Sequence, residues 1–283
     1  MARSRGADPV SGDASVQLWA LDTSPRAGQE GASLFLVAAW AHPGGKTWAL
    51  KWEPGAGEAG AAGGKVDLGM LAVARGDGAV ALYSAAVPEA WCRGAAPDLA
   101  AAAARQGQAW TPLAEFSPDA DAVAPNSGVC PGQAVDVPSA LDWTPCPAPH
   151  GPSSLLAVAT WGGSVHLLRV AGAGVGAAGG AAELERLASM SVDDEPCRHV
   201  EILSRDPYAG RAGGDGPAAP RGGSWGAVLG SVYVCAGDGQ GHVQMFDPTD
   251  PFSPVLTLGQ SIQGGYQALA ARLMRRPFLA SGE

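Results

Sequence analysis

The side chains that could carry out catalysis or bind a metal are dispersed along this sequence. The histidines lie at positions 42, 150, 166, 199 and 242, and the cysteines at positions 92, 130, 146, 197 and 235. None of them has C-x-x-C, H-x-H or H-E-x-x-H spacing. Zinc sites and nucleophilic catalysis both need such groups to converge. We therefore expect no enzymatic activity, no metal and no cofactor.

Three short motifs could suggest chemistry, and each has a plainer explanation. Cys197 and His199 could begin a zinc site, but no second pair lies near enough in the sequence to complete four ligands. The glycine-rich run 237–241 resembles a phosphate loop, but the strand-like HVQMF follows it where a helix would be needed. We expect a hairpin turn there. The acidic run 193–195 could bind a divalent ion, but a solvated turn is favoured.

The charge balance restricts the possible partners. The chain has 18 Lys and Arg against 27 Asp and Glu, a net charge of −9. Proteins that bind DNA mainly through its phosphates are usually basic, so we expect any DNA contact to be indirect. Arg272, Arg275 and Arg276 could touch phosphates, but a solvated edge or a protein contact is favoured. No stretch of 18 large apolar residues predicts a membrane span, and no motif indicates a small-molecule ligand.

A repeated hairpin pattern supplies the elements that must position any functional residues. Three segments align: LGMLAVARGDGAVALYS, SLLAVATWGGSVHLLR and SVYVCAGDGQGHVQMFD. Each has an apolar strand, a turn centred on glycine and an alternating second strand. Val80, Val165 and Val243 hold corresponding positions. A repeat of this kind is typical of propeller blades. We predict an all-β propeller with three complete blades and a partial blade at each end.

Each blade is predicted to have four strands. In the first complete blade they are expected at residues 48–52, 68–74, 79–84 and near 112–116. Alternation in TWALKW places Trp48, Leu50 and Trp52 on one side of the first strand, which predicts a buried face. Two strands should precede this blade, and two weak ones are expected at residues 266–273 and 277–280.

Residues rich in glycine, alanine and proline separate these strands. Residues 1–13 are expected to form a disordered tail, and residues 14–283 one propeller segment. Long disordered loops are predicted within that segment near residues 53–65, 93–109, 118–135, 171–182 and 206–223. We interpret the chain as a fragment, or a partial gene model, of a larger propeller. The alternative is that its partial blades close a small ring.

Several residues in the hairpins resemble those of WD40 repeats. Asp77-Gly78 precedes an alternating strand, and Phe246-Asp247 ends another. His42 lies just before a strand that contains tryptophan, at the place where WD40 repeats often have a Gly-His pair. The resemblance implies that His42 and Asp77 form a structural hydrogen bond, and it implies such a pair in the first unit only.

A sharper resemblance covers residues 16–91. The run LFLVAAWAHPGGKTWALKWEP, followed by LGMLAVARGDGAVALYSAAVPEAW, is similar to the WD40-repeat subunit of TFIIIC, the factor that recruits RNA polymerase III. FDPTDPFSP, at residues 246–254, is similar to a second motif of that family. The resemblance implies a nuclear, non-catalytic scaffold bound to other TFIIIC subunits. It would support transcription of tRNA and 5S rRNA genes through recognition of the B-box promoter by the complex.

Partner contacts are expected on the face that carries the hairpin turns. The candidate residues are His42, Asp77, Trp161 and Asp238. Trp161 lies in a turn between strands, so it could anchor a partner or pack against the neighbouring blade. Two alternatives to the TFIIIC subunit stay open. One is a WD40 adaptor in another nuclear or cytoplasmic complex, and the other is an enzyme built on a propeller.

Overall fold

The computed structural model describes eleven stretches of the chain. These are residues 14–22, 33–54, 61–62, 64–88, 108–118, 136–146, 153–172, 182–192, 196–205, 225–239 and 241–258. The N-terminal tail, the last two predicted strands, the arginines near the C-terminus and the acidic run 193–195 lie outside these residues. The described elements are β-strands, apart from the short helix α3 (Trp225–Leu229). No helix among the described residues is long and apolar enough to cross a membrane.

The first sheet is incomplete compared with the other three. Strands β1 (Ala14–Asp22) and β2 (Ser33–His42) pair antiparallel, and β7 (Gln108–Ala109) adds to β2 in parallel. β7 lies at the end of a segment, 93–109, for which the sequence predicts a loop. The residue after it, Trp110, is buried between the rings of Trp40 and Tyr83, with ring centroids 4.7 and 4.2 Å away. This stack joins the first sheet to the second.

The second sheet contains the four strands predicted for the first complete blade. Their order is β3 (Thr47–Trp52), β5 (Lys65–Arg75), β6 (Val80–Pro88) and β8 (Ala114–Phe116). The two-residue strand β4 (Ala61–Ala62) pairs with the start of β5, so the predicted loop 53–65 also contains strand residues.

The third and fourth sheets repeat the same antiparallel order. The third contains β9 (Pro138–Pro145), β10 (Ser154–Thr160), β11 (Ser164–Ala171) and β12 (Glu183–Ser191). The fourth contains β13 (Cys197–Ser204), β14 (Val232–Asp238), β15 (Val243–Asp247) and β16 (Asp250–Leu258). Helix α3 precedes β14 and was not predicted.

The three aligned hairpins turn at equivalent glycines. Gly78, Gly163 and Gly241 each lie two residues before an aligned valine, and their φ angles are 94°, 84° and 94°. Residues with a Cβ rarely adopt such angles, whereas glycine does so readily. The shared geometry confirms the alignment of the three segments.

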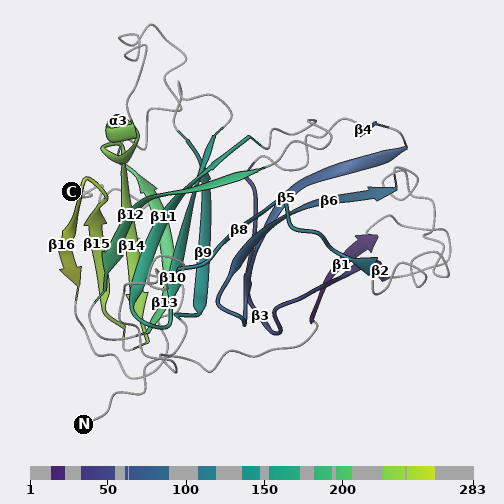
Figure 1. The fold of residues 1–283 in the computed structure, drawn as a ribbon, viewed down its shortest axis with the longest axis horizontal. Coiled ribbons are helices and arrows are strands. Elements are labelled where there is room, and N and C mark those ends of the chain that lie inside the picture. Colours follow the sequence, from purple (N-terminus) through teal and green to yellow (C-terminus); the bar gives the residue numbers. More distant parts are fainter. Residues whose placement is uncertain are drawn as a thin grey trace, which may run out of the picture.

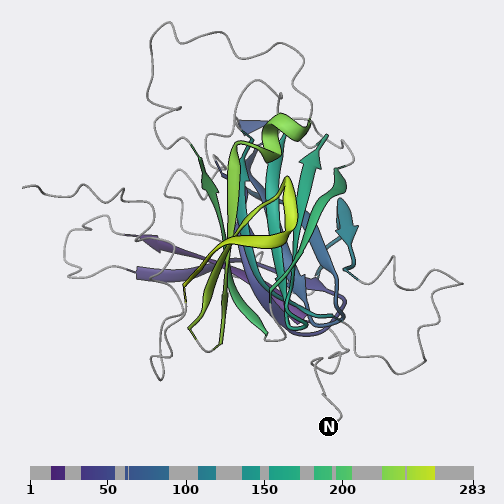
Figure 2. The same ribbon diagram turned by 90° about the vertical axis from the view of Figure 1, so that its left-hand side faces the viewer.

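The sheets stack face to face in a row, as Figures 1 and 2 show. One apolar core lies between the first and second sheets, around Tyr83 and Trp110. A second core lies between the second and third sheets, around Leu82 and Leu156, and a third lies between the third and fourth, around Leu167 and Phe246. Stacked sheets of this kind, of which the last three each have four antiparallel strands in the same order, are the blade arrangement of a propeller. The predicted fold class, an all-β WD40-like propeller, is confirmed.

A buried carboxylate ties together the first strands of three blades. Asp142 of β9 is 6% exposed and lies 2.7 Å from the Nζ atom of Lys51 in β3. Its other oxygen accepts a hydrogen bond of 2.8 Å from the backbone N–H of Ile202 in β13. Because β3, β9 and β13 belong to different sheets, this contact fixes the spacing of the blades along one side of the row.

The prediction of a buried face on β3 is wrong for two of its three residues. Trp48 is half-buried against the third sheet, but Leu50 and Trp52 are 47% and 37% exposed. The reason is that β3 is an edge strand, and the described strands of the first sheet cover mainly β5 and β6.

The two ends of the row do not meet in the described part of the chain. Figure 1 places β1 and β2 at one end and β16 at the other. The partial blade predicted near the C-terminus lies outside the described residues, so the small ring considered above stays a prediction. Strand β16 exposes several large apolar side chains, of which Phe252 is 92% exposed.

Candidate interaction surface at the hairpin turns

All four predicted contact residues lie at one end of the sheets, which we call the turn surface. It consists of the turns β5–β6, β10–β11 and β14–β15 together with the residues that lead into β3, β9 and β13. Backbone pairing brings these segments together, because Thr47 pairs with Arg75, Pro138 with Thr160 and Cys197 with Asp238. Loops presented in this way on a rigid scaffold are common binding sites.

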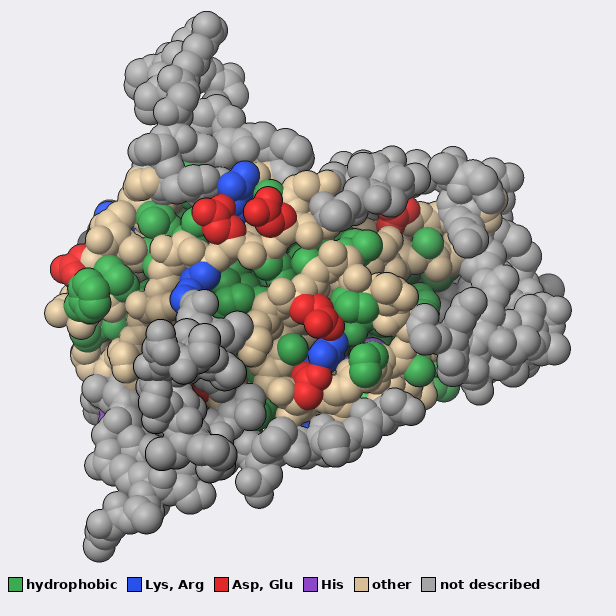
Figure 3. Space-filling view, viewed as in Figure 1, with side chains coloured by type: hydrophobic (Ala, Val, Ile, Leu, Met, Phe, Trp, Pro, Cys, Tyr) green, Lys and Arg blue, Asp and Glu red, His purple; other side chains and the backbone are tan. Residues whose placement is uncertain are grey.

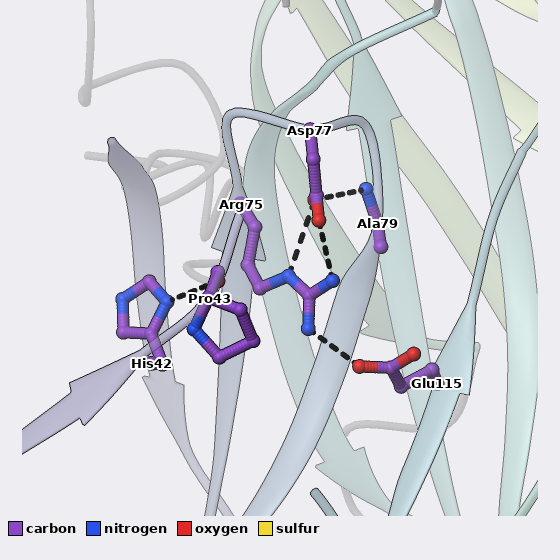
Figure 4. Close-up of polar contacts among 6 residues, drawn as sticks. All are labelled: His42, Pro43, Arg75, Asp77, Ala79 and Glu115. Carbon is purple, nitrogen blue, oxygen red and sulfur yellow. Dashed lines mark hydrogen bonds and ion pairs between the residues drawn. The ribbon is translucent and has the colours of Figure 1, made fainter. Parts of the chain in front are cut away.

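The β5–β6 turn is held by a cluster of ion pairs around Arg75, shown in Figure 4. The side chain of Arg75 is only 7% exposed; its Nε lies 3.1 Å from Asp77 Oδ1 and its Nη2 lies 2.5 Å from Asp77 Oδ2. Its Nη1 lies 2.5 Å from Glu115 Oε1 in β8. Burial alone would lower the pKa of Arg75, but these hydrogen bonds and charges raise it above its usual range. The guanidinium is therefore permanently charged and joins the turn to the outer strand.

His42 does not form the hydrogen bond with Asp77 that the WD40 resemblance implies. Its Nδ1 lies 2.8 Å from the carbonyl oxygen of Pro43, and its Nε2 lies 2.8 Å from Thr47 Oγ1. Both ring nitrogens are thus used locally, and Asp77 is occupied by Arg75 and by the N–H of Ala79. His42 is 1% exposed, so it shapes the loop between β2 and β3 from inside.

The β10–β11 turn has no acidic residue of its own and uses one from outside the hairpin. Asp136, which precedes β9, accepts a hydrogen bond of 2.8 Å from the Thr160 hydroxyl and one of 2.7 Å from the N–H of Gly162. The turn is also joined to this segment through the N–H of Trp161, which donates to Val137 O. Sequence reasoning missed Asp136, because the residue is distant from the turn in sequence.

A histidine–aspartate pair does exist, but in the third hairpin. Asp238 Oδ2 lies 2.7 Å from His242 Nδ1, and Asp238 Oδ1 accepts from the His242 backbone N–H at 2.9 Å. The side chain of Asp238 is 5% exposed, and that of His242 is 40% exposed. The i, i+4 spacing across a glycine-rich turn was the available signal. Asp238 is consequently a turn-stabilising residue, and His242 is the exposed member of the pair.

Trp161 contacts both of its neighbouring blades. Its ring meets Trp48 of the second sheet edge to face, with centroids 5.6 Å apart at an interplanar angle of 65°. The guanidinium of Arg198, from the fourth sheet, lies 4.6 Å from its centroid. On the far side, Lys46 Nζ lies 4.0 Å from the centroid of Trp48. Lys46, Trp48, Trp161 and Arg198 form a continuous row across three blades, which we call the aromatic row.

The two indole N–H groups of the aromatic row are buried and have no hydrogen-bond acceptor among the described residues. A buried donor without a partner costs about 1–3 kcal/mol of stability. A phenylalanine would fill much of the same space without that cost. Residues kept against a stability cost of this kind are often retained for binding.

The titratable and metal-binding side chains of the described residues are dispersed. They include no group of three or more His, Cys, Asp or Glu side chains able to hold a metal ion. Burial raises the pKa of Cys197 and of Cys235 to about 12 and that of Cys146 to about 11, so these thiols stay protonated at neutral pH. Figure 3 shows acidic and basic side chains in small mixed groups on the visible face, with apolar side chains between them.

Comparison with known proteins gives structural neighbours only. No protein-family model and no curated protein matches the sequence. Sqt1 of Saccharomyces cerevisiae matches with a TM-score of 0.38 and 11% identity over 80% of this chain and 38% of its own. The WD40 domain of SCAP from fission yeast matches with a TM-score of 0.35 and 9% identity, over 76% and 32%. The WD40 domain of Toxoplasma gondii coronin matches with a TM-score of 0.40 and 12% identity, over 91% and 55%.

Two of these neighbours are WD40 domains, but the scores are too low to support any inference about function. The chain spans between about a third and just over half the length of each matched structure. The assignment of this chain to the WD40-like propeller class therefore depends on its own strand order, stacked sheets and equivalent hairpin turns.

Proposed function

We propose that this chain is a non-catalytic scaffold subunit of TFIIIC, acts in the nucleus and supports transcription by RNA polymerase III. Its partners would be other TFIIIC subunits, the genes transcribed would be those for tRNA and 5S rRNA, and its contact with the B-box promoter of tRNA genes would be indirect. One observation carries the proposal. The family-like run TWALKWEP followed by LGMLAVARGDGAVALYS occupies β3, β5 and β6 of a single blade.

The physical features of the turn surface agree with a binding role. Three turns from adjacent blades are held in place by internal hydrogen bonds and ion pairs, so they present a rigid surface. A rigid surface loses little conformational entropy when it binds a partner. The net charge of −9 opposes binding to DNA phosphates through the surface as a whole.

The test is affinity purification of the tagged full chain from nuclei of its source cells, followed by mass spectrometry. We expect the other TFIIIC subunits to co-purify in amounts comparable to the bait. A tagged chain carrying Asp142→Ala is a useful control, because loss of the contact between β3, β9 and β13 should reduce recovery by disturbing the blade row. Recovery of an unrelated complex with no TFIIIC subunit would overturn the proposal.

The second candidate is an adaptor of the WD40 type in a different nuclear or cytoplasmic complex. The aromatic row is as compatible with such an adaptor as with a TFIIIC subunit, because a surface with paired tryptophans and cations can bind many protein partners. The same purification distinguishes the two candidates, since an adaptor would recover a defined complex of other composition.

A further inference from the structure

We propose that the aromatic row binds a short acidic segment of a partner protein in an extended conformation. The proposal rests on the scaffold function and specifies the chemistry of one of its partners. The row has an exposed cation at each end, Lys46 and Arg198, and two half-buried tryptophans between them. The 5.6 Å contact between Trp48 and Trp161 makes the two rings one continuous surface.

The cations have hydrogen-bonding capacity to offer. Lys46 and Arg198 each lie over a tryptophan ring, and neither forms an ion pair with a carboxylate of the described residues. Stacking on a ring orients a guanidinium or ammonium group while leaving its N–H donors free to bind an oxygen. The ammonium group of Lys46 has three N–H donors and the guanidinium group of Arg198 has five, and both groups attract negative charge.

The acidic groups nearby are committed to internal partners. Asp77 is held by Arg75, Asp136 by Thr160 and Gly162, and Asp238 by His242. A basic segment would have to break these bonds to reach a carboxylate, whereas an acidic segment would meet cations that are already exposed. This difference in available partners, rather than the net charge of the chain, selects an acidic ligand.

The spacing suits a peptide better than a nucleic acid. Residues of an extended chain repeat every ~3.3 Å and alternate faces, so two carboxylates four positions apart point to the same side and lie ~13 Å apart. The successive separations along the row are 4.0, 5.6 and 4.6 Å, so such a pair can reach both of its ends. An apolar residue between them would lie on the tryptophan rings. A nucleic acid would carry a charge on every nucleotide to a protein of net charge −9, with only two cations to receive it.

The experiment measures binding of fluorescein-labelled peptides to the purified full chain by fluorescence anisotropy at low ionic strength. The first probe is a thirteen-residue peptide in which Glu recurs at every fourth position with Leu midway between. Two matched probes carry Gln or Lys in place of Glu, and an oligonucleotide of similar length is the fourth. We expect the Glu peptide to bind about tenfold more tightly than the Gln peptide and the oligonucleotide.

Three variants locate the binding site. Lys46→Gln combined with Arg198→Gln should abolish the preference for Glu, and Trp161→Ala should weaken all the peptides that bind. Arg186→Gln is the matched control, because it removes one exposed cation from β12, away from the turns, and should leave the affinity unchanged within about twofold. Circular dichroism of each variant shows whether it is folded, and the single substitutions at Lys46 and Arg198 serve if the double variant is not.

The proposal is overturned if the Glu and Gln peptides bind equally, if the Lys peptide or the oligonucleotide binds more tightly, or if the double variant retains the preference. Failure of the scaffold function is a separate result. A chain that prefers the Glu peptide but recovers no TFIIIC subunit contradicts the assignment to TFIIIC alone. A chain that recovers TFIIIC but has no preference contradicts the acidic-segment proposal alone.

Discussion

The β5–β6 and β10–β11 turns both pack a carboxylate against a glycine, but the two residues have exchanged places between the turn and the connection that precedes the blade. In the first, the carboxylate of Asp77 belongs to the turn, and the glycine that makes room for it, Gly44, lies in the connection between blades. In the second, Asp136 lies in the connection, and Gly162 in the turn makes room. A Cβ atom at Gly44 would lie 2.4 Å from Asp77 Oδ2, and one at Gly162 would lie 2.5 Å from Asp136 Oδ1.

The exchange shows that the carboxylate must lie beside the turn, but that it can come from either of two positions in the repeated sequence. Each turn has backbone N–H groups that the strand ladder does not pair. An acidic side chain that accepts from them can come from either side of the contact. The two turns differ in what else binds the carboxylate: Arg75 in the first, and the neutral Thr160 hydroxyl in the second.

The largest expected effect is the loss of the arginine that distinguishes the first turn. Arg75→Leu leaves Asp77 and Glu115 near each other without their shared cation. Removing one partner of a buried pair can cost 3–5 kcal/mol, and because both carboxylates are partly exposed we expect about 3 kcal/mol. Urea unfolding measures this loss in the free energy of unfolding.

Arg169→Leu is the matched control, because its pair with Glu185 is more exposed and should contribute less than about 1 kcal/mol. Equal losses from the two variants would contradict the distinction.

The two glycines should differ in their response to alanine. Gly44 has a φ of +93°, so Gly44→Ala introduces backbone strain as well as the clash with Asp77. We expect it to cost about 2 kcal/mol, and Gly162→Ala, for which only the clash applies, about 1 kcal/mol. Gly64→Ala is the control for strain alone, since Gly64 also has positive φ but nothing within 4 Å of the added Cβ. A smaller loss at Gly44 than at Gly64 would show that the carboxylate moves aside freely.

A double-mutant cycle tests whether the carboxylate can be moved from one side of the contact to the other. Asp136→Gly removes the acceptor of Thr160 and Gly162, and Gly162→Asp alone places a second carboxylate against the first. The double variant restores one carboxylate and one glycine in the arrangement of the β5–β6 turn. We expect it to be more stable than the sum of the single losses by about 1 kcal/mol in urea unfolding. If the stability losses of the two single variants simply add, the carboxylate stabilises this turn only from position 136, and the two positions are not interchangeable.

The fold was predictable from the sequence because its signals are local. Alternating strands, glycine turns and their recurrence identified the four strands of the second sheet and the aligned hairpins of the other two complete blades. The row of blades follows from that repeat, since the second and third sheets have buried apolar residues on both faces. Helix α3 and the two-residue strands gave no such signal, because their position depends on packing between distant segments.

The candidate site was predictable only in outline. Trp161 and the turn carboxylates Asp77 and Asp238 could be selected because they lie in recognisable turns. The aromatic row could not, since Trp48, Trp161 and Arg198 come from three different blades and become neighbours only when those blades stack. The implied pairing of His42 with Asp77 was wrong for a local reason. Arg75 competes for the same carboxylate from a position two residues away.

The smallest expected effect concerns a third arrangement, in the turn between β15 and β16, where a carboxylate is held by both neutral and charged donors. Burial by itself would raise the pKa of Asp247, but hydrogen bonds from the Thr249 N–H and hydroxyl, together with Arg205, lower it below its ordinary value of 3.8. A lowered pKa in the folded state contributes stability that is fully present above the unfolded-state pKa and is lost as the pH falls through the folded-state value.

The stability difference between the natural chain and Asp247→Asn should therefore be constant near neutral pH and shrink below about pH 4. Chemical unfolding at a series of pH values measures it, with Asp250→Asn, an exposed carboxylate of the same turn, as the control. A difference that grows on acidification would have the wrong sign and would show that Asp247 is not stabilised as a carboxylate in the folded protein.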